Sequence, residues 1–256
     1  MIRNLSLFVT IIIFSFFSSY LAKAETMENI NQLYSSANKE YKSANYLKAE
    51  EEYEKIINSG INNGYVFFNL GNTYFKLNQN GQALANYLKA QDLLPRENKV
   101  NKNLNQLYEK INYEPSSFDK VSGLFKFFSL KETIILFLGI WFLIFLLFLI
   151  KKSNNLKVLK NLNKVNGLMT FLFIFFLYFS TSLAFRLFVS SENKAVVVVQ
   201  ESDVKVSNNI SDITLFKVKE SQIINIIDEQ GDWAKINLDD KKGWINKSSI
   251  EKISEF

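Results

Sequence analysis

The sequence predicts a multidomain membrane protein with an all-α repeat domain, a two-helix transmembrane hairpin and a C-terminal all-β domain. Three observations support this fold class. Residues 134–150 and 168–185 are long apolar runs without a charge, a helical pattern repeats itself before them, and short β-branched runs alternate with turns after them. Two buried core helices are the alternative, but flanks so rich in Asn, Lys and Glu could not supply enough apolar cover for them.

The two apolar runs predict transmembrane helices over residues 132–150 and 167–189. With the residues just before it, the first run reaches about 20 residues, enough to cross a hydrocarbon core of about 30 Å. The second run has hydroxyls as its only polar groups, and these can bond to carbonyls of their own helix. Arg186 comes at the end of this run, where its long side chain can reach the lipid headgroups.

The connection between the runs, residues 151–166, predicts the orientation of the hairpin. It contains five lysines and no acidic residue. Short cytoplasmic loops of membrane proteins collect Lys and Arg. We therefore expect a basic cytoplasmic loop, with the segments before and after the hairpin on the opposite side of the membrane.

The N-terminus predicts export. Residues 1–24 combine the basic Arg3, an apolar stretch over residues 5–17 and a small-residue cleavage site, as is typical of a signal peptide cleaved after Ala24. An uncleaved anchor helix is the alternative. Either interpretation places the next segment outside the cytoplasm, in agreement with the loop lysines. In a bacterium this predicts a multi-pass protein of the inner (cytoplasmic) membrane, with N- and C-terminal domains in the periplasm.

The composition argues against several function classes. The net charge is +5, and the chain has no Cys and no His. The excess of basic residues lies at the N-terminus and in the loop, so neither soluble domain has the basic footprint of a nucleic-acid-binding domain. Without His or Cys, the commonest general base, the thiol nucleophile and the soft metal ligands are missing. We expect a protein that is not an enzyme and that uses no metal or cofactor.

Residues 25–114 predict the all-α repeat domain. One constant offset aligns the segment with itself, because small residues meet small residues and bulky residues meet bulky ones. The aligned pairs are Leu33 with Phe67, Ala37 with Gly71, Ala49 with Ala83, and Tyr53 with Tyr87. Small residues let paired helices approach, and aromatic residues fill the gaps between pairs. The pattern and its period of about 34 residues resemble the tetratricopeptide repeat family.

The second copy carries the resemblance most clearly. Its bulky, small and turn positions hold Phe67, Leu70, Gly71, Tyr74, Ala83, Tyr87, Ala90 and Pro95. The first copy departs from the pattern at Glu40, and at Ile61 in place of Pro. A third helix over residues 97–111 keeps the register at Leu104 but has Asn105 at the small position. We interpret it as a polar capping helix after two repeats.

The resemblance implies that the first helix of each pair lines a concave, peptide-binding face. On these helices Asn38 aligns with Asn72 and Lys42 with Lys76. Amides can bond to an extended peptide backbone, and lysines can bind a carboxylate. The candidate partner-binding residues are Asn38, Tyr41, Lys42, Asn72, Phe75, Lys76, Lys102 and Gln106. A solvated helix face that happens to repeat is the alternative.

The helical domain and its connection to the membrane both suggest further contacts. Two repeats and a cap are few for a stable array, so we expect a protein partner, a second copy or the membrane surface to supply more burial. In residues 115–131, Phe125, Phe127 and Phe128 come just before the first transmembrane helix. They predict an interfacial membrane segment, with a flexible linker as the alternative.

Residues 190–256 predict the all-β domain. Strand signals lie at 195–199, 204–206, 216–218 and 223–227, and turn signals lie at 208–209, 229–232 and 239–243. The sequences GDWAKI and KGWI lie on either side of a charged turn. This order resembles the bacterial SH3-like domain family. The resemblance implies a barrel of about five strands, with Trp233 and Trp244 on successive strands and Gly243 at the tight hairpin between them. The two tryptophans then form a recognition groove or pack in the core.

The order of all segments resembles the BatE family of the Bacteroides aerotolerance operon. That resemblance implies a membrane scaffold that works beside membrane-anchored von Willebrand A domain proteins and a MoxR-type ATPase, in an aerotolerance or envelope-stress complex. An envelope-anchoring module is the alternative, in which the SH3-like domain holds peptidoglycan.

Overall fold

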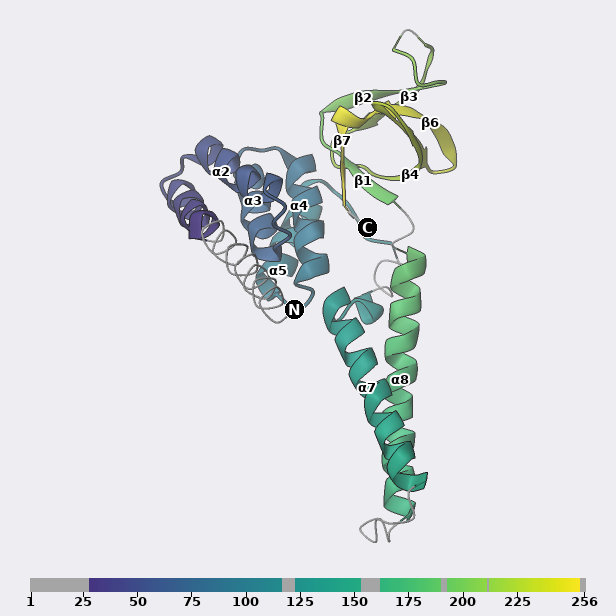
Figure 1. Ribbon diagram of the computed structural model, residues 1–256. Coiled ribbons are helices and arrows are strands. Elements are labelled where there is room, and N and C mark those ends of the chain that lie inside the picture. Colours follow the sequence, from purple (N-terminus) through teal and green to yellow (C-terminus); the bar gives the residue numbers. More distant parts are fainter. Residues whose placement is uncertain (1–27, 117–122, 153–161, 190–192, 211, 254–256) are drawn as a thin grey trace, which may run out of the picture.

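The computed structural model describes residues 28–116, 123–152, 162–189, 193–210 and 212–253. The predicted signal peptide and most of the predicted basic loop lie outside the described residues. Figure 1 shows a helical domain (residues 28–116) and a β domain (residues 193–253) side by side at one end of a long two-helix hairpin. The order of parts along the chain is therefore the predicted one.

The helical domain consists of five helices. They are the helix over residues 28–42, α2 (Tyr46–Asn58), α3 (Gly64–Lys76), α4 (Asn80–Leu93) and α5 (Asn98–Lys110). From α2 to α5, each helix packs against the next one in the chain. Two N-termini are capped by side chains: Asn63 accepts from the N–H of Tyr65 at 2.8 Å, and Glu97 accepts from the N–H of Lys99. The all-α prediction is confirmed, and α5 matches the third predicted helix.

Three of these helices end in the same backbone motif, at the same interval that relates the sequence copies. Ala44, Asn78 and Asn112 all have positive φ angles, of 61°, 60° and 53°. The next N–H then reaches a carbonyl five residues back, from Asn45 to Glu40, from Gln79 to Tyr74 and from Tyr113 to Tyr108. This is the Schellman arrangement of a helix C-terminus. The structural repeat therefore extends to the end of α5, beyond the two sequence copies.

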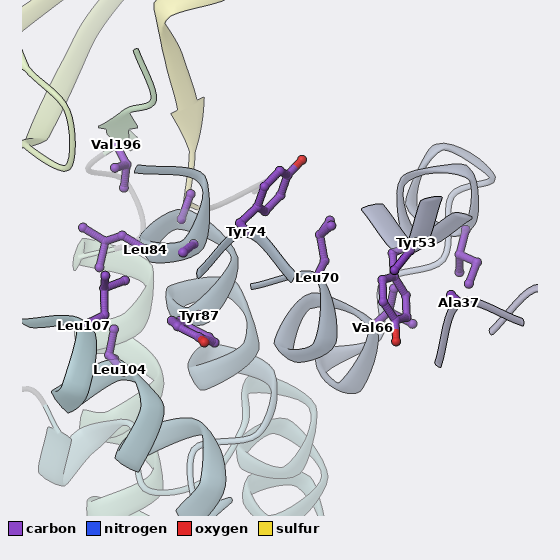
Figure 2. Packing of buried hydrophobic residues seen from close by; sticks show 14 residues of the cluster. Ala37, Tyr53, Val66, Leu70, Tyr74, Leu84, Tyr87, Leu104, Leu107 and Val196 are labelled. Carbon is purple, nitrogen blue, oxygen red and sulfur yellow. The ribbon is translucent and has the colours of Figure 1, made fainter. Parts of the chain in front are cut away.

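The core of the helical domain follows the alternation of small and aromatic residues. Tyr53 and Tyr87 are buried, and the alanines aligned at positions 49 and 83 are fully buried as well. A Cβ on Gly71 would lie 2.7 Å from the ring of Tyr87, so that only glycine leaves room for the ring there. Figure 2 shows Tyr87 among the packed side chains of this cluster.

The two apolar helices form the hairpin. They are α7 (Leu130–Lys152) and α8 (Leu162–Val189), which pack along each other. Both are long and apolar enough to cross a membrane. The rings of Phe137 and Phe176 stack between them at 5.2 Å. α7 extends past its predicted span at both ends, and α8 begins before its predicted start and ends at the predicted residue.

Arg186 differs from its expected role. Its side chain is only 5 % exposed, and it donates to the carbonyl of Phe128 rather than extending away from the protein. The apolar pattern of the second run gives no sign of this contact, because Phe128 precedes the hairpin in the chain.

The β domain is one antiparallel sheet. Its strands are β1 (Asn193–Val197), β2 (Glu201–Lys205), β3 (Thr214–Lys219), β4 (Ile223–Gln230), β5 (Trp233–Leu238), β6 (Lys241–Asn246) and β7 (Ile250–Lys252). Their order is β3-β2-β6-β5-β4-β1-β7. Val204, Val218, Ile224, Ile236 and Ile245 lie in the buried cluster of this domain. Seven strands rather than about five are present among the described residues, and the last of them, β7, pairs with β1.

Gly243 does not lie at the hairpin turn where the sequence resemblance placed it. The β5–β6 hairpin turns at Asp239 and Asp240, whose φ angles are 49° and 65°. Gly243 lies within β6, where a Cβ would come 2.9 Å from the carbonyl oxygen of Lys205. Glycine is therefore needed for the close approach of β2, while two aspartates take the left-handed conformation that Asp tolerates better than most residues.

The β domain packs against α4 through β1 and β7. Val196 of β1 belongs to the buried cluster of the helical domain, and Figure 2 shows it next to Leu84, with Leu107 of α5 below. The close approach depends on Gly81, since a Cβ there would lie 2.8 Å from the Cα of Val198. The β domain thus supplies burial that two helical repeats lack.

Polar contacts hold the same junction. The N–H of Gly81 donates to Glu220 Oε1 at 2.9 Å, and Lys89 Nζ lies 2.8 Å from Glu251 Oε1. Glu251 Oε1 also accepts from the Nδ2 of Asn86 at 3.2 Å. A mixed polar and apolar contact of this kind is typical of interfaces between domains.

Candidate partner-binding surface

Asn72 is the centre of a hydrogen-bond relay between neighbouring helices. Its Oδ1 accepts from the hydroxyl of Tyr87 at 2.8 Å and from the Nδ2 of Asn103 at 2.6 Å. The three residues belong to α3, α4 and α5. The relay therefore ties the first helix of the second repeat to its own partner helix and to the next helix.

The same relay occurs one repeat earlier. Asn38 Oδ1 accepts from the hydroxyl of Tyr53 at 2.8 Å and from the Nδ2 of Asn69 at 2.9 Å. Asn69 also donates to the hydroxyl of Tyr34. All three members of the relay recur at one offset, so the geometry as well as the sequence is repeated.

Both tyrosines of the relays are buried. Burial raises the pKa of Tyr53 and of Tyr87 well above the ordinary value for a phenol, since a phenolate would lose its hydration. A phenol is already protonated at neutral pH, so burial extends that state to higher pH, and each hydroxyl donates to its asparagine. In this arrangement the Oδ1 of each asparagine accepts two hydrogen bonds.

This arrangement leaves the other half of each amide for a ligand. Within the described part of the chain, the Nδ2 groups of Asn38 and Asn72 donate to no protein acceptor. Both side chains are half-buried. Two fixed N–H donors, repeated on neighbouring helices, can bond to carbonyls of an extended peptide.

Three lysines lie on the same set of helices. Lys42, Lys76 and Lys102 are exposed, and none of them forms an ion pair with another described residue. Lys42 follows Asn38 by four positions, and Lys76 follows Asn72 by four, so each pair shares a helix face. Three cations without internal partners favour an acidic ligand or a terminal carboxylate.

The remaining predicted groove residues are less alike. Gln106 is exposed on α5, whereas Tyr41 and Phe75 are half-buried. The ring of Tyr41 meets that of Tyr46 at 5.5 Å. Lys110 Nζ lies 4.7 Å from the ring centre of Phe75, so a cation covers this aromatic side chain.

Sequence reasoning missed Asn69, Asn103 and Lys110. The first two are partners in the relay, and the offset that aligned the other pairs also aligns these two with each other. That signal was available in the sequence. The same offset aligns Lys110 with Lys76, although its contact with Phe75 depends on how α5 packs.

The two tryptophans lie on the outer face of the β domain. On β5 and β6 the inward positions are Ala234, Ile236 and Ile245, and Trp233 and Trp244 alternate with them and are half-buried. Trp233 lines a groove of about 380 Å³ together with Glu201, Ser202, Asp203, Lys205, Ile210, Lys217 and Asn246. Trp244 lies under Lys235, whose Nζ is 5.9 Å from the ring centre.

The described ranges contain no group of three acidic, His or Cys side chains that could hold a metal ion. Comparisons with known proteins add no relative: no family model matches the chain, and no curated protein matches it significantly.

Proposed function

We propose that the protein is a non-enzymatic, membrane-anchored scaffold that binds protein partners on the periplasmic side. The observation that carries this proposal is the repeated relay, which holds Asn38 and Asn72 with their Nδ2 groups unpaired beside Lys42 and Lys76. Two amides at matching positions of successive repeats suit a surface that binds an extended chain, because peptide carbonyls also recur at regular intervals. They have no evident use in an enzyme site.

The family resemblances point in the same direction. The helical domain has the small and aromatic pattern of a tetratricopeptide repeat domain, and the β domain has the tryptophan order of the bacterial SH3-like family. With the hairpin between them, the chain resembles the BatE family. We propose that its partners are membrane proteins with von Willebrand A domains, in an aerotolerance or envelope-stress complex.

Co-purification tests the binding surface. Asn72→Ala combined with Lys76→Ala removes one relay amide and one lysine from α3. Since a charge-assisted hydrogen bond contributes about 1.5–3 kcal/mol, partner recovery from a detergent extract should fall sharply, and the wild-type complex should loosen with added salt. Glu51→Ala combined with Lys55→Ala is the matched control, because it removes an exposed ion pair from α2. Equal recovery by both double variants would exclude this surface.

Reporter fusions test the orientation that the scaffold needs. Fusions after Glu114, Asn161 and Glu255 should report periplasm, cytoplasm and periplasm in turn. The loop lysines and the N-terminal segment support this order independently. A cytoplasmic signal at Glu114 or Glu255 would contradict it.

The groove beside Trp233 favours a second candidate function, envelope anchoring through peptidoglycan. Asp203 lies in this groove with the indole ring, and a carboxylate beside an aromatic face suits an amino group of a peptide, whereas Glu201 is paired with Lys217. Trp233→Ala should then abolish sedimentation with purified cell wall, whereas the α3 double variant should sediment normally. If neither the wild type nor any variant sediments with the cell wall, peptidoglycan anchoring is excluded.

A further inference from the structure

Three side chains of α8 form a ladder of donors on one helix face. Tyr178, Ser182 and Arg186 are spaced by four residues, which places them one above another. The hydroxyl of Tyr178 donates to the carbonyl of Leu124 at 2.9 Å, and the hydroxyl of Ser182 donates to the carbonyl of Phe125 at 2.7 Å. Arg186 donates to the carbonyl of Phe128.

The acceptors all belong to one short piece of chain, the 123–129 segment. Aromatic contacts fix it to the same helix face, with Phe125 stacked on Phe185 at 4.8 Å and Phe128 against Phe179 at 5.4 Å. The segment therefore lies along α8 and does not simply link the helical domain to α7.

The position of the ladder gives the depth of the segment. The apolar part of α8 runs from Asn166 to Leu187. Tyr178 lies eight residues before Arg186, which is about 12 Å along a helix that rises about 1.5 Å per residue. The Leu124 end of the 123–129 segment therefore lies beside apolar surface of α8, and its Phe128 end lies level with Arg186 near the end of the span.

The chemistry of the segment fits that depth. Carbonyls that lie in hydrocarbon must find donors inside the protein, and the ladder supplies three. Leu124 and Phe127 are 68 % and 51 % exposed, and the guanidinium of Arg96 lies 5.6 Å from the ring centre of Phe127. In water these exposed side chains would be unfavourable, at about 25 cal/mol per Å² of apolar area. Next to the exposed apolar faces of α7 and α8, they continue one surface.

The 123–129 segment also contacts the helical domain. Arg96, just after α4, donates to the carbonyl of Phe127 and to both carboxylate oxygens of Glu132. Asp92 of α4 lies 3.7 Å from Lys126 and also 3.7 Å from Arg186. The charged groups gather where the apolar side chains end, as they do at a membrane surface.

We propose that the 123–129 segment is a wedge in the membrane leaflet on the side of the two soluble domains, and that it seats the helical domain on the bilayer. Lipid acyl chains are its partner. Continuity with the lipid-facing surface of the hairpin selects them over water or a second protein. The proposal rests on the hairpin's crossing of the membrane, and it is independent of what the helical domain binds.

Spin-label accessibility tests the wedge directly. The chain has no cysteine, so single labels at Leu124→Cys and Phe127→Cys in the full-length protein in nanodiscs are unambiguous. Lys102→Cys serves as the aqueous reference, and Leu138→Cys of α7 serves as the lipid reference. Both segment labels should collide with oxygen as often as Leu138 does and should be protected from a water-soluble nickel chelate.

Each other outcome overturns the wedge in a distinguishable way. Nickel contact at Leu124 and Phe127, with Leu138 still protected, means that the segment lies in water although the hairpin spans. Nickel contact at all three positions means that the hairpin does not span the bilayer either. Protection from both reagents at Phe127 means that protein, not lipid, covers the segment.

Two matched variants test the ladder. Ser182→Ala removes the donor to Phe125, and Thr181→Ala removes a neighbouring hydroxyl that bonds to carbonyls of its own helix. Nickel contact at the Phe127 label should rise with Ser182→Ala and stay unchanged with Thr181→Ala. An equal response to both variants would show that the ladder does not hold the segment.

Discussion

Tyr87 donates its hydroxyl hydrogen to Asn72 Oδ1 at 2.8 Å, and this single bond joins the core of the helical domain to its candidate binding face. The tyrosine ring is buried between helices, where it meets Gly71, while the asparagine lies at the boundary with solvent. A buried aromatic residue therefore sets the direction in which a surface amide presents its N–H groups. The equivalent bond from Tyr53 to Asn38 does the same one repeat earlier.

Removing that hydroxyl should weaken both stability and binding. Tyr87→Phe keeps the ring but deprives Asn72 of one donor, so it should cost about 0.5–1.5 kcal/mol, the usual net value of such a bond. Thermal unfolding followed by circular dichroism measures this. Tyr65→Phe is the control, because Tyr65 is exposed and should lose almost nothing. Equal shifts in Tm for the two variants would mean that the relay contributes nothing.

The contact at Ala83 should tolerate no charge. Ala83 is fully buried in α4, so Ala83→Glu both overfills the site and buries an unpaired carboxylate. The expected loss is several kcal/mol, visible as a large fall in Tm. Glu51→Ala on the exposed side of α2 should change stability by about 0.5 kcal/mol or less. Similar Tm losses for the two variants would contradict the helix faces described above.

High pH should unfold the helical domain. Burial raises the pKa of Tyr53, Tyr74 and Tyr87, and Tyr74 also donates to Glu54. The stability that depends on neutral hydroxyls is fully present below about pH 10, the pKa of an unfolded tyrosine, and is lost as the pH rises further. Tyrosinate absorbance should show a late step that coincides with loss of helix. Complete ionisation while the helices persist would show that these hydroxyls are open to water.

The junction between the domains should depend on Glu251. Glu251→Gln removes the charge that pairs with Lys89, whose side chain is largely buried there. The distance between spin labels at Asn58 and Lys241 should then become broadly distributed. Glu201→Gln breaks an ion pair with Lys217 inside the β domain and should leave the distribution narrow. A narrow distribution in both variants would mean that the apolar contact at Val196 holds the two domains together without the ion pair.

Much of the fold could be predicted because local pattern determines it. The apolar runs, the small and aromatic alternation and the β-branched runs each reflect one element and its immediate neighbours. Gly243 shows where such reasoning ends. Glycine before a tryptophan suggested a turn, but the turn falls on Asp239 and Asp240, and the glycine is required by β2, a strand far away in the chain.

The contacts between parts could not be predicted for a related reason. Arg186 contacts Phe128, and Lys89 contacts Glu251, only after separate elements pack, and no spacing in the chain relates the members of either pair. The relay is the exception, because all of its members recur at the same offset. A repeated sequence predicts repeated contacts within a domain, but it does not predict contacts between domains.

Site-specific photo-crosslinking in membranes tests the central proposal, that the repeated face of the helical domain binds a partner protein. Photoreactive residues are placed at Lys42, Lys76 and Lys102, and at Lys55 on α2 as the control. The proposal predicts that all three positions crosslink to the same von Willebrand A domain protein, identified by mass spectrometry, and that Lys55 does not. Crosslinking from Lys55 alone, or from none of the four positions in membranes that contain the partner, would contradict it.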